Sequence, residues 1–120
     1  MEFIIHTHNG TKIAELKKGS MKVTSSQDIL DIMANANDQE STSQVIYEED
    51  LGHKFFALKT GLAGEILQKY SNYRNSVAIV GDFSNVESKS LRDFIYESNK
   101  TGRISFVSNI ESAKEILTSK

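Results

Sequence analysis

The stretch 77-VAIVGDF-83 decides the fold class of this chain. Its apolar run from Val77 to Val80 has no polar break and is stopped by Gly81 and Asp82. A strand with one solvated face alternates apolar and polar residues, whereas an unbroken apolar run indicates a strand that is covered on both faces. The stretch therefore predicts a central strand of a mostly parallel sheet on which helices pack.

The segments around this run alternate between helix and strand patterns. Residues 61–73, 84–102 and 109–117 have apolar side chains at helical spacing, and 103-RISFVS-108 reads as another strand. Asn109 is the predicted N-cap of the last helix. The apolar faces of the three helices are Leu62, Ile66, Leu67, Tyr70 and Tyr73, then Leu91, Phe94 and Ile95, and then Ile110, Ala113, Ile116 and Leu117.

The N-terminal part of the chain predicts a β-hairpin. Two β-prone runs, 2-EFIIHTH-8 and 11-TKIAEL-16, flank Asn9-Gly10. Asn-Gly is a strong hairpin signal because both central residues of a type I′ turn need a positive φ. The first strand would form an edge of the sheet, and open edges invite pairing. A homodimer formed at this edge is therefore one expected arrangement.

Between the hairpin and the central strand, the chain predicts a helix and a further strand. Ser25 lies three residues before Asp28, as in a capping box with Asp in place of Glu. The apolar face of this helix is Ile29, Leu30, Met33 and Ala36. The segment 44-QVIYEED-50 is a short strand that ends in three acids, and the conformation of Leu51–Lys59 stays open.

The predicted order is ββαβαβαβα in one α/β domain that spans residues 1–120. Strands that alternate with helices imply a mixed, mostly parallel sheet with right-handed crossovers, to which the hairpin adds an antiparallel edge.

Composition excludes several classes of function. The 120 residues carry a net charge of −2, so no basic excess drives nucleic-acid binding. There is no cysteine for a disulfide, a thiol nucleophile or a Cys-based metal site. The start MEFIIHTHNG is neither a signal peptide nor a membrane span. We therefore expect a cytoplasmic protein that binds neither nucleic acid nor membranes.

Three segments carry a family resemblance. The stretches 60-TGLAGEILQKYSNY-73, 77-VAIVGDFS-84 and 88-SKSLRDFIYESN-99 resemble an uncharacterised bacterial family known as domain of unknown function 4180. The resemblance covers most of the chain, and the family has no established activity.

The order of elements resembles a second family, the STAS domains of anti-sigma-factor antagonists. The pair Thr60-Gly61, followed by a helix that begins Leu62-Ala63-Gly64, is similar to the hydroxyl-glycine pair of those domains. The resemblance implies that a partner kinase phosphorylates Thr60 and thereby switches the binding of a protein partner. STAS antagonists usually carry an Asp just before the pair, whereas Leu58 and Lys59 stand here.

The residues around Thr60 have two interpretations of their own. Thr60 can be a helix N-cap, with Gly61 and Gly64 letting the helix approach a neighbouring strand. Alternatively, the free N–H groups and the partial positive charge of a helix N-terminus, together with Lys59, favour an anion such as a phosphate on Thr60.

The carboxyl ends of the strands offer a second candidate site. Asp82 and Ser84 follow the central strand, and we expect Glu48–Asp50 and Asn109 to cluster with them near Thr60. Ligands of open α/β sheets bind at this end, so the cluster is either a catalytic, metal or small-ligand site or a set of solvated turns. Neither common nucleotide fingerprint and no G-x-S-x-G elbow is present, and we expect no cofactor.

Two further patterns have a structural and a functional interpretation. His6 and His8 share one strand face, with His53 as a third candidate metal ligand, but H-x-H alone is unspecific and we expect no metal. Phe55-Phe56 could form an apolar patch that a partner covers.

We therefore expect a regulatory module that binds a protein partner and is switched at Thr60, with Lys59, Gly61, Asp82 and Ser84 at the contact site. The alternative is a small enzyme or small-ligand binder that uses Asp50, Asp82 and Ser84.

Overall fold

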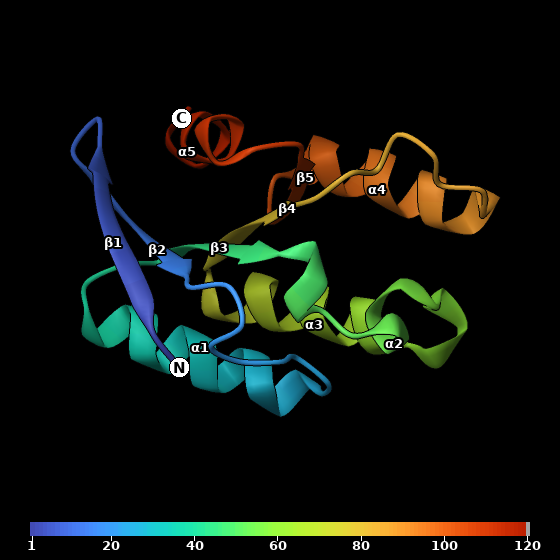
Figure 1. The fold of residues 1–120 in the computed structure, drawn as a ribbon, viewed down its shortest axis with the longest axis horizontal. Helices are drawn as coiled ribbons and strands as arrows, with labels where there is room; N and C mark the ends of the chain where they lie inside the picture. Colours follow the sequence, from blue (N-terminus) through green and yellow to red (C-terminus); the bar gives the residue numbers. More distant parts are fainter. Residues whose placement is uncertain (120) are drawn as a thin grey trace.

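The computed structural model describes residues 1–119 and contains one five-stranded sheet (Figure 1). Its strands lie in the order in which they occur in the chain. They are β1 (Phe3–His8), β2 (Thr11–Leu16), β3 (Ser43–Tyr47), β4 (Ser76–Val80) and β5 (Ile104–Val107). β1 is antiparallel to β2, and every other neighbouring pair is parallel. The predicted fold class and order of elements are confirmed.

Local signals placed the hairpin and the central strand correctly. Asn9 has φ 50° and Gly10 has φ 79°, as a type I′ turn requires, and the hairpin register pairs His8 with Thr11. All five residues of β4 are buried. Both faces of this strand are covered, which is why the sequence could use apolar residues without alternation.

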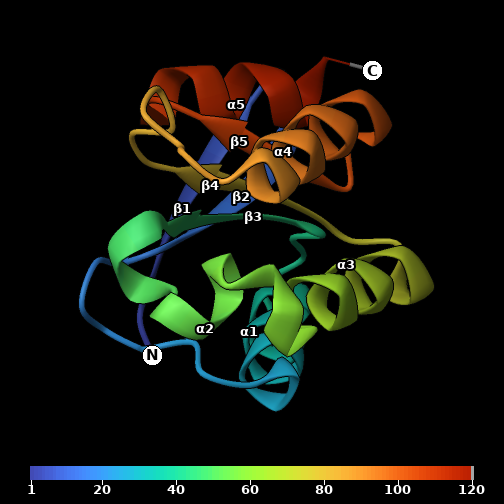
Figure 2. The same cartoon turned by 90° about the vertical axis from the view of Figure 1, so that its right-hand side faces the viewer.

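The helices form a layer on each side of the sheet (Figure 2). α1 (Ser26–Asp38) and α3 (Leu62–Tyr73) cover one face over the larger core, and α5 (Ile110–Thr118) covers the other face over a smaller one. Two short helices, α2 (His53–Phe56) and η2 (Leu58–Thr60), occupy the segment from Leu51 whose conformation the sequence left open. The three acids predicted to end the strand form a further short helix, η1 (Glu48–Asp50), because β3 stops at Tyr47.

Helix α4 (Lys89–Thr101) lies along β5, the last strand of the sheet. The predicted core face of this helix is only half-buried, because Phe94 and Ile95 pack at the margin of the larger core. The Oδ1 of Asn99 accepts a hydrogen bond of 2.7 Å from the backbone N–H of Phe106. Helix α4 thus satisfies a donor on the outer edge of the sheet.

The predicted helix caps are confirmed. The Ser25 hydroxyl accepts from the backbone N–H of Asp28, and the Asp28 carboxylate accepts in return from the N–H of Ser25. Backbone and side-chain bonds from Thr24 and Ser25, outweighing desolvation, hold the pKa of Asp28 below its usual value. Asn109 caps α5 by accepting from Ser112 N at 2.8 Å.

Three positions were placed wrongly on apolar faces by spacing alone. Tyr73 is exposed as the last residue of α3, and Ile116 is exposed on α5, whose neighbouring Leu117 enters the smaller core instead. Leu30 is half-buried, and Ile32 instead fills the core. Within residues 1–119, no helix is long and apolar enough to cross a membrane.

A buried amide cluster joins α1, β3 and the start of β4. The Oδ1 of Asn75 accepts hydrogen bonds of 2.8 Å from the Asn37 amide and of 2.8 Å from the Gln44 amide. Its own Nδ2 donates to the carbonyl of Tyr73. Asn75 therefore fixes the point at which the chain leaves α3 and enters the central strand.

We predict that Asn75→Ala lowers the free energy of unfolding by about 3 kcal/mol, because it leaves the buried Gln44 amide without an acceptor. Asn35→Ala is the matched control, since the Asn35 amide is exposed and bonds only within its own helix. Urea denaturation followed by circular dichroism measures both variants. Equal midpoints would show that the amide cluster does not stabilise the fold.

Candidate functional site

A hollow of about 400 Å³ lies at the carboxyl ends of β4 and β5. Its lining combines aromatic rings with hydroxyl groups. The lining residues are Gly81, Asp82, Phe83, Ser84, Phe106, Val107, Ser108 and Ser112. The strands of this sheet follow one another without a reversal of order, so the fold has no switch-point crevice, and the hollow is an open one formed by loops.

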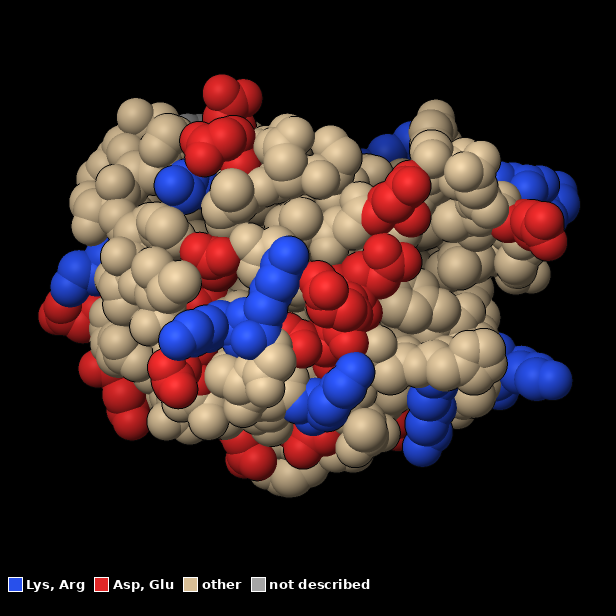
Figure 3. Space-filling view, in the orientation of Figure 1, with Lys and Arg blue, Asp and Glu red and all other residues tan. Residues whose placement is uncertain are grey.

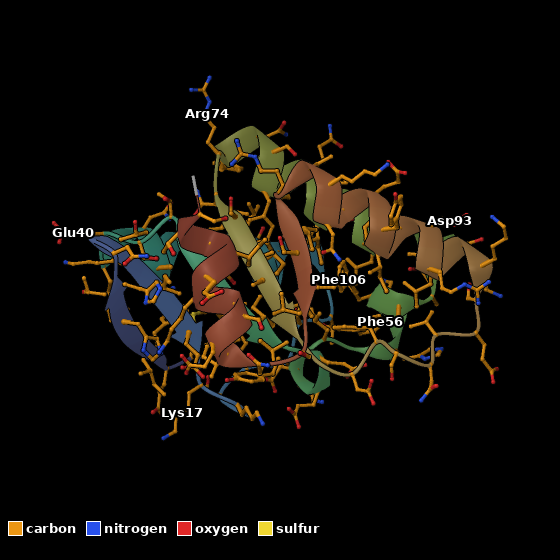
Figure 4. The ribbon with its side chains drawn as sticks, turned by 90° about the horizontal axis from the view of Figure 1, so that it is seen from above. Lys17, Glu40, Phe56, Arg74, Asp93 and Phe106 are labelled. Atoms are coloured by element: carbon orange, nitrogen blue, oxygen red, sulfur yellow. The ribbon has the colours of Figure 1, made fainter. Side chains whose placement is uncertain are left out.

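Aromatic rings connect the hollow to the α2 helix. Phe83 packs edge-on against Phe106 with centroids 5.1 Å apart, and Phe56 lies 6.2 Å from Phe83. Figure 4 labels Phe56 and Phe106 in the same part of the view, and Phe83 packs against both of them. Phe55 is fully buried, so the prediction that Phe55-Phe56 forms an exposed apolar patch is wrong.

The structure brings Asp82 and Ser84 together at the rim of the hollow. The Ser84 hydroxyl and backbone N–H donate to the same Asp82 oxygen at 2.6 Å and 3.1 Å. The bond from the Ser84 hydroxyl is the main cause that lowers the pKa of Asp82. Asp82 is exposed, and its lowered pKa makes it a weaker base.

The neighbouring acids hold loops together. Glu48 Oε1 accepts from the N–H of Asp82 at 3.2 Å. Asp50 is 2% exposed and accepts from the N–H of Gly19 at 3.1 Å and 3.3 Å, which ties down the loop after β2. The predicted cluster of Glu48–Asp50, Asp82 and Asn109 near Thr60 forms only in part. Glu48 bonds to Asp82, and Ser108 and Ser112 beside Asn109 line the same hollow. Asp50 instead bonds to Gly19, and Thr60 bonds to Lys54 and Leu62.

Thr60 stands just before the start of α3, although not as its cap. Gly61 is the N-cap, with φ 83°, and it requires glycine for that reason. Thr60 is exposed at the end of η2. Its hydroxyl donates to the carbonyl of Lys54 at 2.7 Å and accepts from the N–H of Leu62 at 3.3 Å.

Two expectations about this segment change. Gly64 does not serve a close helix approach, since a methyl group there would meet no atom within 4 Å. Thr60 does not line the hollow. Helix α2 instead links Thr60 to the hollow. The Thr60 hydroxyl bonds to the carbonyl of Lys54, and Phe56 of the same helix packs on Phe83, which lines the hollow.

A second polar cluster lies on the α5 side of the sheet, and the sequence did not reveal it. Glu15 accepts from the Tyr47 hydroxyl at 2.6 Å and pairs with Nε2 of His6 at 2.7 Å. Burial, reinforced by Glu15, raises the pKa of Tyr47. No group of three metal-ligating side chains forms within residues 1–119, so His6, His8 and His53 do not assemble a metal site there.

Charges of both signs meet at the turn after β3. In Figure 3, acidic side chains gather over the turn after β3, with lysines around them. Lys18 Nζ lies 3.5 Å from the Glu49 carboxylate and 4.6 Å from the centre of the Tyr47 ring. Lys22 Nζ donates to the carbonyl of Glu49 at 2.7 Å.

The family model described as Domain of unknown function (DUF4180) matches residues 8–117. The chain therefore belongs to this family, as its motifs indicated. No curated protein and no solved structure matches it.

The sequence analysis did not include Ser108 and Ser112 among the candidate site residues, although both line the hollow. The position of Ser108 at the end of a predicted strand could have indicated that it lies at this edge of the sheet.

We predict that Gly81→Ala lowers the free energy of unfolding by about 2 kcal/mol, because the new Cβ would lie 2.6 Å from the Cβ of Glu48. The Cβ of Glu48 cannot move away without its backbone. Gly64→Ala is the matched control, and we expect it to stabilise the protein by about 1 kcal/mol, since it removes a glycine from an open helix position. Thermal denaturation of both variants checks the opposite signs, and a stable Gly81→Ala variant would refute the close approach.

Proposed function

We propose that this protein is a small cytoplasmic module that binds a protein partner and is switched by modification of Thr60. The partner would contact the hollow at the ends of β4 and β5 together with the segment 53–61. The observation that carries this proposal is the exposed Thr60 hydroxyl, whose bond to the Lys54 carbonyl closes that segment.

Phosphorylation would remove this bond for a chemical reason. The Thr60 hydroxyl is the donor to the Lys54 carbonyl, and a phosphate ester has no proton to give at that oxygen. Its negative oxygens would repel the carbonyl but could still accept from the N–H of Leu62 at the start of α3. Lys54 and Lys59 are both exposed and would attract the new charge.

The same contacts give the switch a route to the binding surface. Lys54 belongs to α2, whose Phe56 packs on Phe83 in the loop that carries Asp82 and Ser84. A shift of α2 would therefore move a ring that touches the hollow. Closely packed aromatic rings have few alternative arrangements, so a small displacement of Phe56 would also move Phe83.

The hydrogen bonds of the acidic residues near the hollow favour a binding function over a catalytic one. Asp50 is buried on Gly19, and Glu48 accepts from the N–H of Asp82. Asp82 is engaged by Ser84, and the open hollow does not exclude water. An enzyme, the alternative function, would rely on Asp50, Asp82 and Ser84. The carboxylates of Asp50 and Asp82 already accept hydrogen bonds within the protein, which makes them poor candidates for a general base. The resemblance to STAS domains supports the switch by analogy alone.

We predict that Thr60→Glu reduces capture of the partner from native cytoplasm more than tenfold, because it removes the bond to Lys54 and adds a charge. Thr60→Ser keeps the donor and should capture the partner like the unaltered protein. Thr60→Ala removes the bond without a charge and should lie between them. Quantitative mass spectrometry of the captured proteins gives the ratios, and intact mass shows whether phosphate is present on the protein that carries Thr60.

The charge control is Thr42→Glu, since Thr42 is also exposed and lies just before β3, at the opposite end of the strands from the hollow. Capture of the same proteins by all variants, with no added mass on the unaltered chain, would show that Thr60 only closes a turn.

A further inference from the structure

The two edge strands of the sheet, β5 and β1, differ in whether another element covers them. On β5, helix α4 lies along the strand, and Asn99 accepts from the N–H of Phe106. Strand β1 pairs with β2 on one side, and no other element of residues 1–119 lies along its second side (Figure 1). One edge is therefore covered, while the other presents unpaired backbone groups.

Strand β1 also lacks the features that usually prevent an edge strand from pairing with a strand of another molecule. Its sequence FIIHTH contains no Lys, Pro, Asp or Glu, and its register with β2 runs without a bulge from Phe3 to His8. Natural edge strands are commonly protected by such residues or by bulges. Instead, Ile4 is 45% exposed and Ile5 is 37% exposed.

The direction of the free backbone groups follows from the hairpin. The carbonyl of Glu2 accepts from the N–H of Lys17 at 2.9 Å, so Glu2 bonds toward β2. Backbone direction alternates along an antiparallel strand, so Ile4, His6 and His8 also bond inward. The N–H and C=O groups of Phe3, Ile5 and Thr7 therefore point outward, away from β2.

We propose that a second copy of this chain pairs with β1 in antiparallel fashion, about a two-fold axis at Ile5. In this register Ile5 lies opposite Ile5 of the second copy, and Phe3 lies opposite Thr7. Each outward residue then belongs to a hydrogen-bonded pair, and the two sheets become one continuous ten-stranded sheet.

The side chains of the strand are complementary to themselves in this register. Ile4 lies opposite His6 of the second copy, and Glu2 lies opposite His8, all on the α5 face. No like charges oppose each other, and the exposed Ile4 and Ile5 are covered. A shift by two residues in either direction leaves one outward residue unpaired at each end. The strand thus fits a second copy of itself over its full length.

Multi-angle light scattering over a range of concentrations tests the pairing. We expect the unaltered chain to reach twice its monomer mass of 13.4 kDa. Ile5→Lys should return it to monomer mass, because two ammonium groups would face each other at the axis. Ile116→Lys is the matched control, since Ile116 is 42% exposed on α5 away from this edge, and it should remain dimeric.

Cysteine cross-linking tests the register without relying on Ile5→Lys to fold. The chain has no cysteine, so a single introduced thiol is unambiguous. The Cα atoms of a hydrogen-bonded pair lie about 5.5 Å apart, which a disulfide spans. Ile5→Cys should therefore oxidise to a covalent dimer, whereas Thr7→Cys should not, since its two copies would lie about 13 Å apart.

Monomer mass at every concentration, or a dimer that Ile5→Lys leaves intact, would overturn the proposal. Efficient cross-linking of Thr7→Cys but not of Ile5→Cys would also refute this register. A monomer that instead binds an added extended peptide at β1 would assign the edge to a foreign strand.

Discussion

The complete burial of β4 is the constraint on which the rest of this structure depends. Val77 and Ile79 enter the larger core, while Ala78 and Val80 enter the smaller one. A strand of this kind loses its driving force unless apolar helices cover both faces. The helices α1, α3 and α5 follow from that need, and the buried Asn75 amide fixes where the strand begins.

The same constraint limits where the central strand can offer polar groups. Because β4 is covered along its whole length, this strand can present them only where it stops, at Gly81 and beyond. Most carboxylates there are used to hold loops, as the contacts of Glu48 with Asp82 and of Asp50 with Gly19 show. Exposed hydroxyl groups and an open hollow remain available, and these suit recognition of a surface better than proton transfer in a closed site.

Sequence reasoning succeeded where the cause is local and failed where it is distant. The turn at Asn9 and the caps at Ser25 and Asn109 depend on residues within four positions, and all were predicted. The role of Thr60 depends on a carbonyl six residues earlier, which an additional turn of helix brings near. Asp50 bonds to Gly19 across 31 positions, a contact that no spacing rule contains. The sequence therefore placed Asp82 and Ser84 at the end of the central strand, where the hollow lies, but it did not predict the backbone contacts of the neighbouring acids.

The two proposals concern opposite ends of the sheet, and this separation has a consequence. The hollow lies beyond β4 and β5, while the proposed dimer axis lies outside β1. With strands about 4.8 Å apart, two hollows in a dimer would be separated by about 40 Å across the joined sheet. The two-fold axis reverses the direction of the strands, so the two hollows would open at opposite ends of the joined sheet. Pairing at β1 would leave both Thr60 residues exposed, and each copy would hold its own partner molecule. The open edge and the exposed hydroxyl would then act together, one by setting the number of binding surfaces and the other by setting their state.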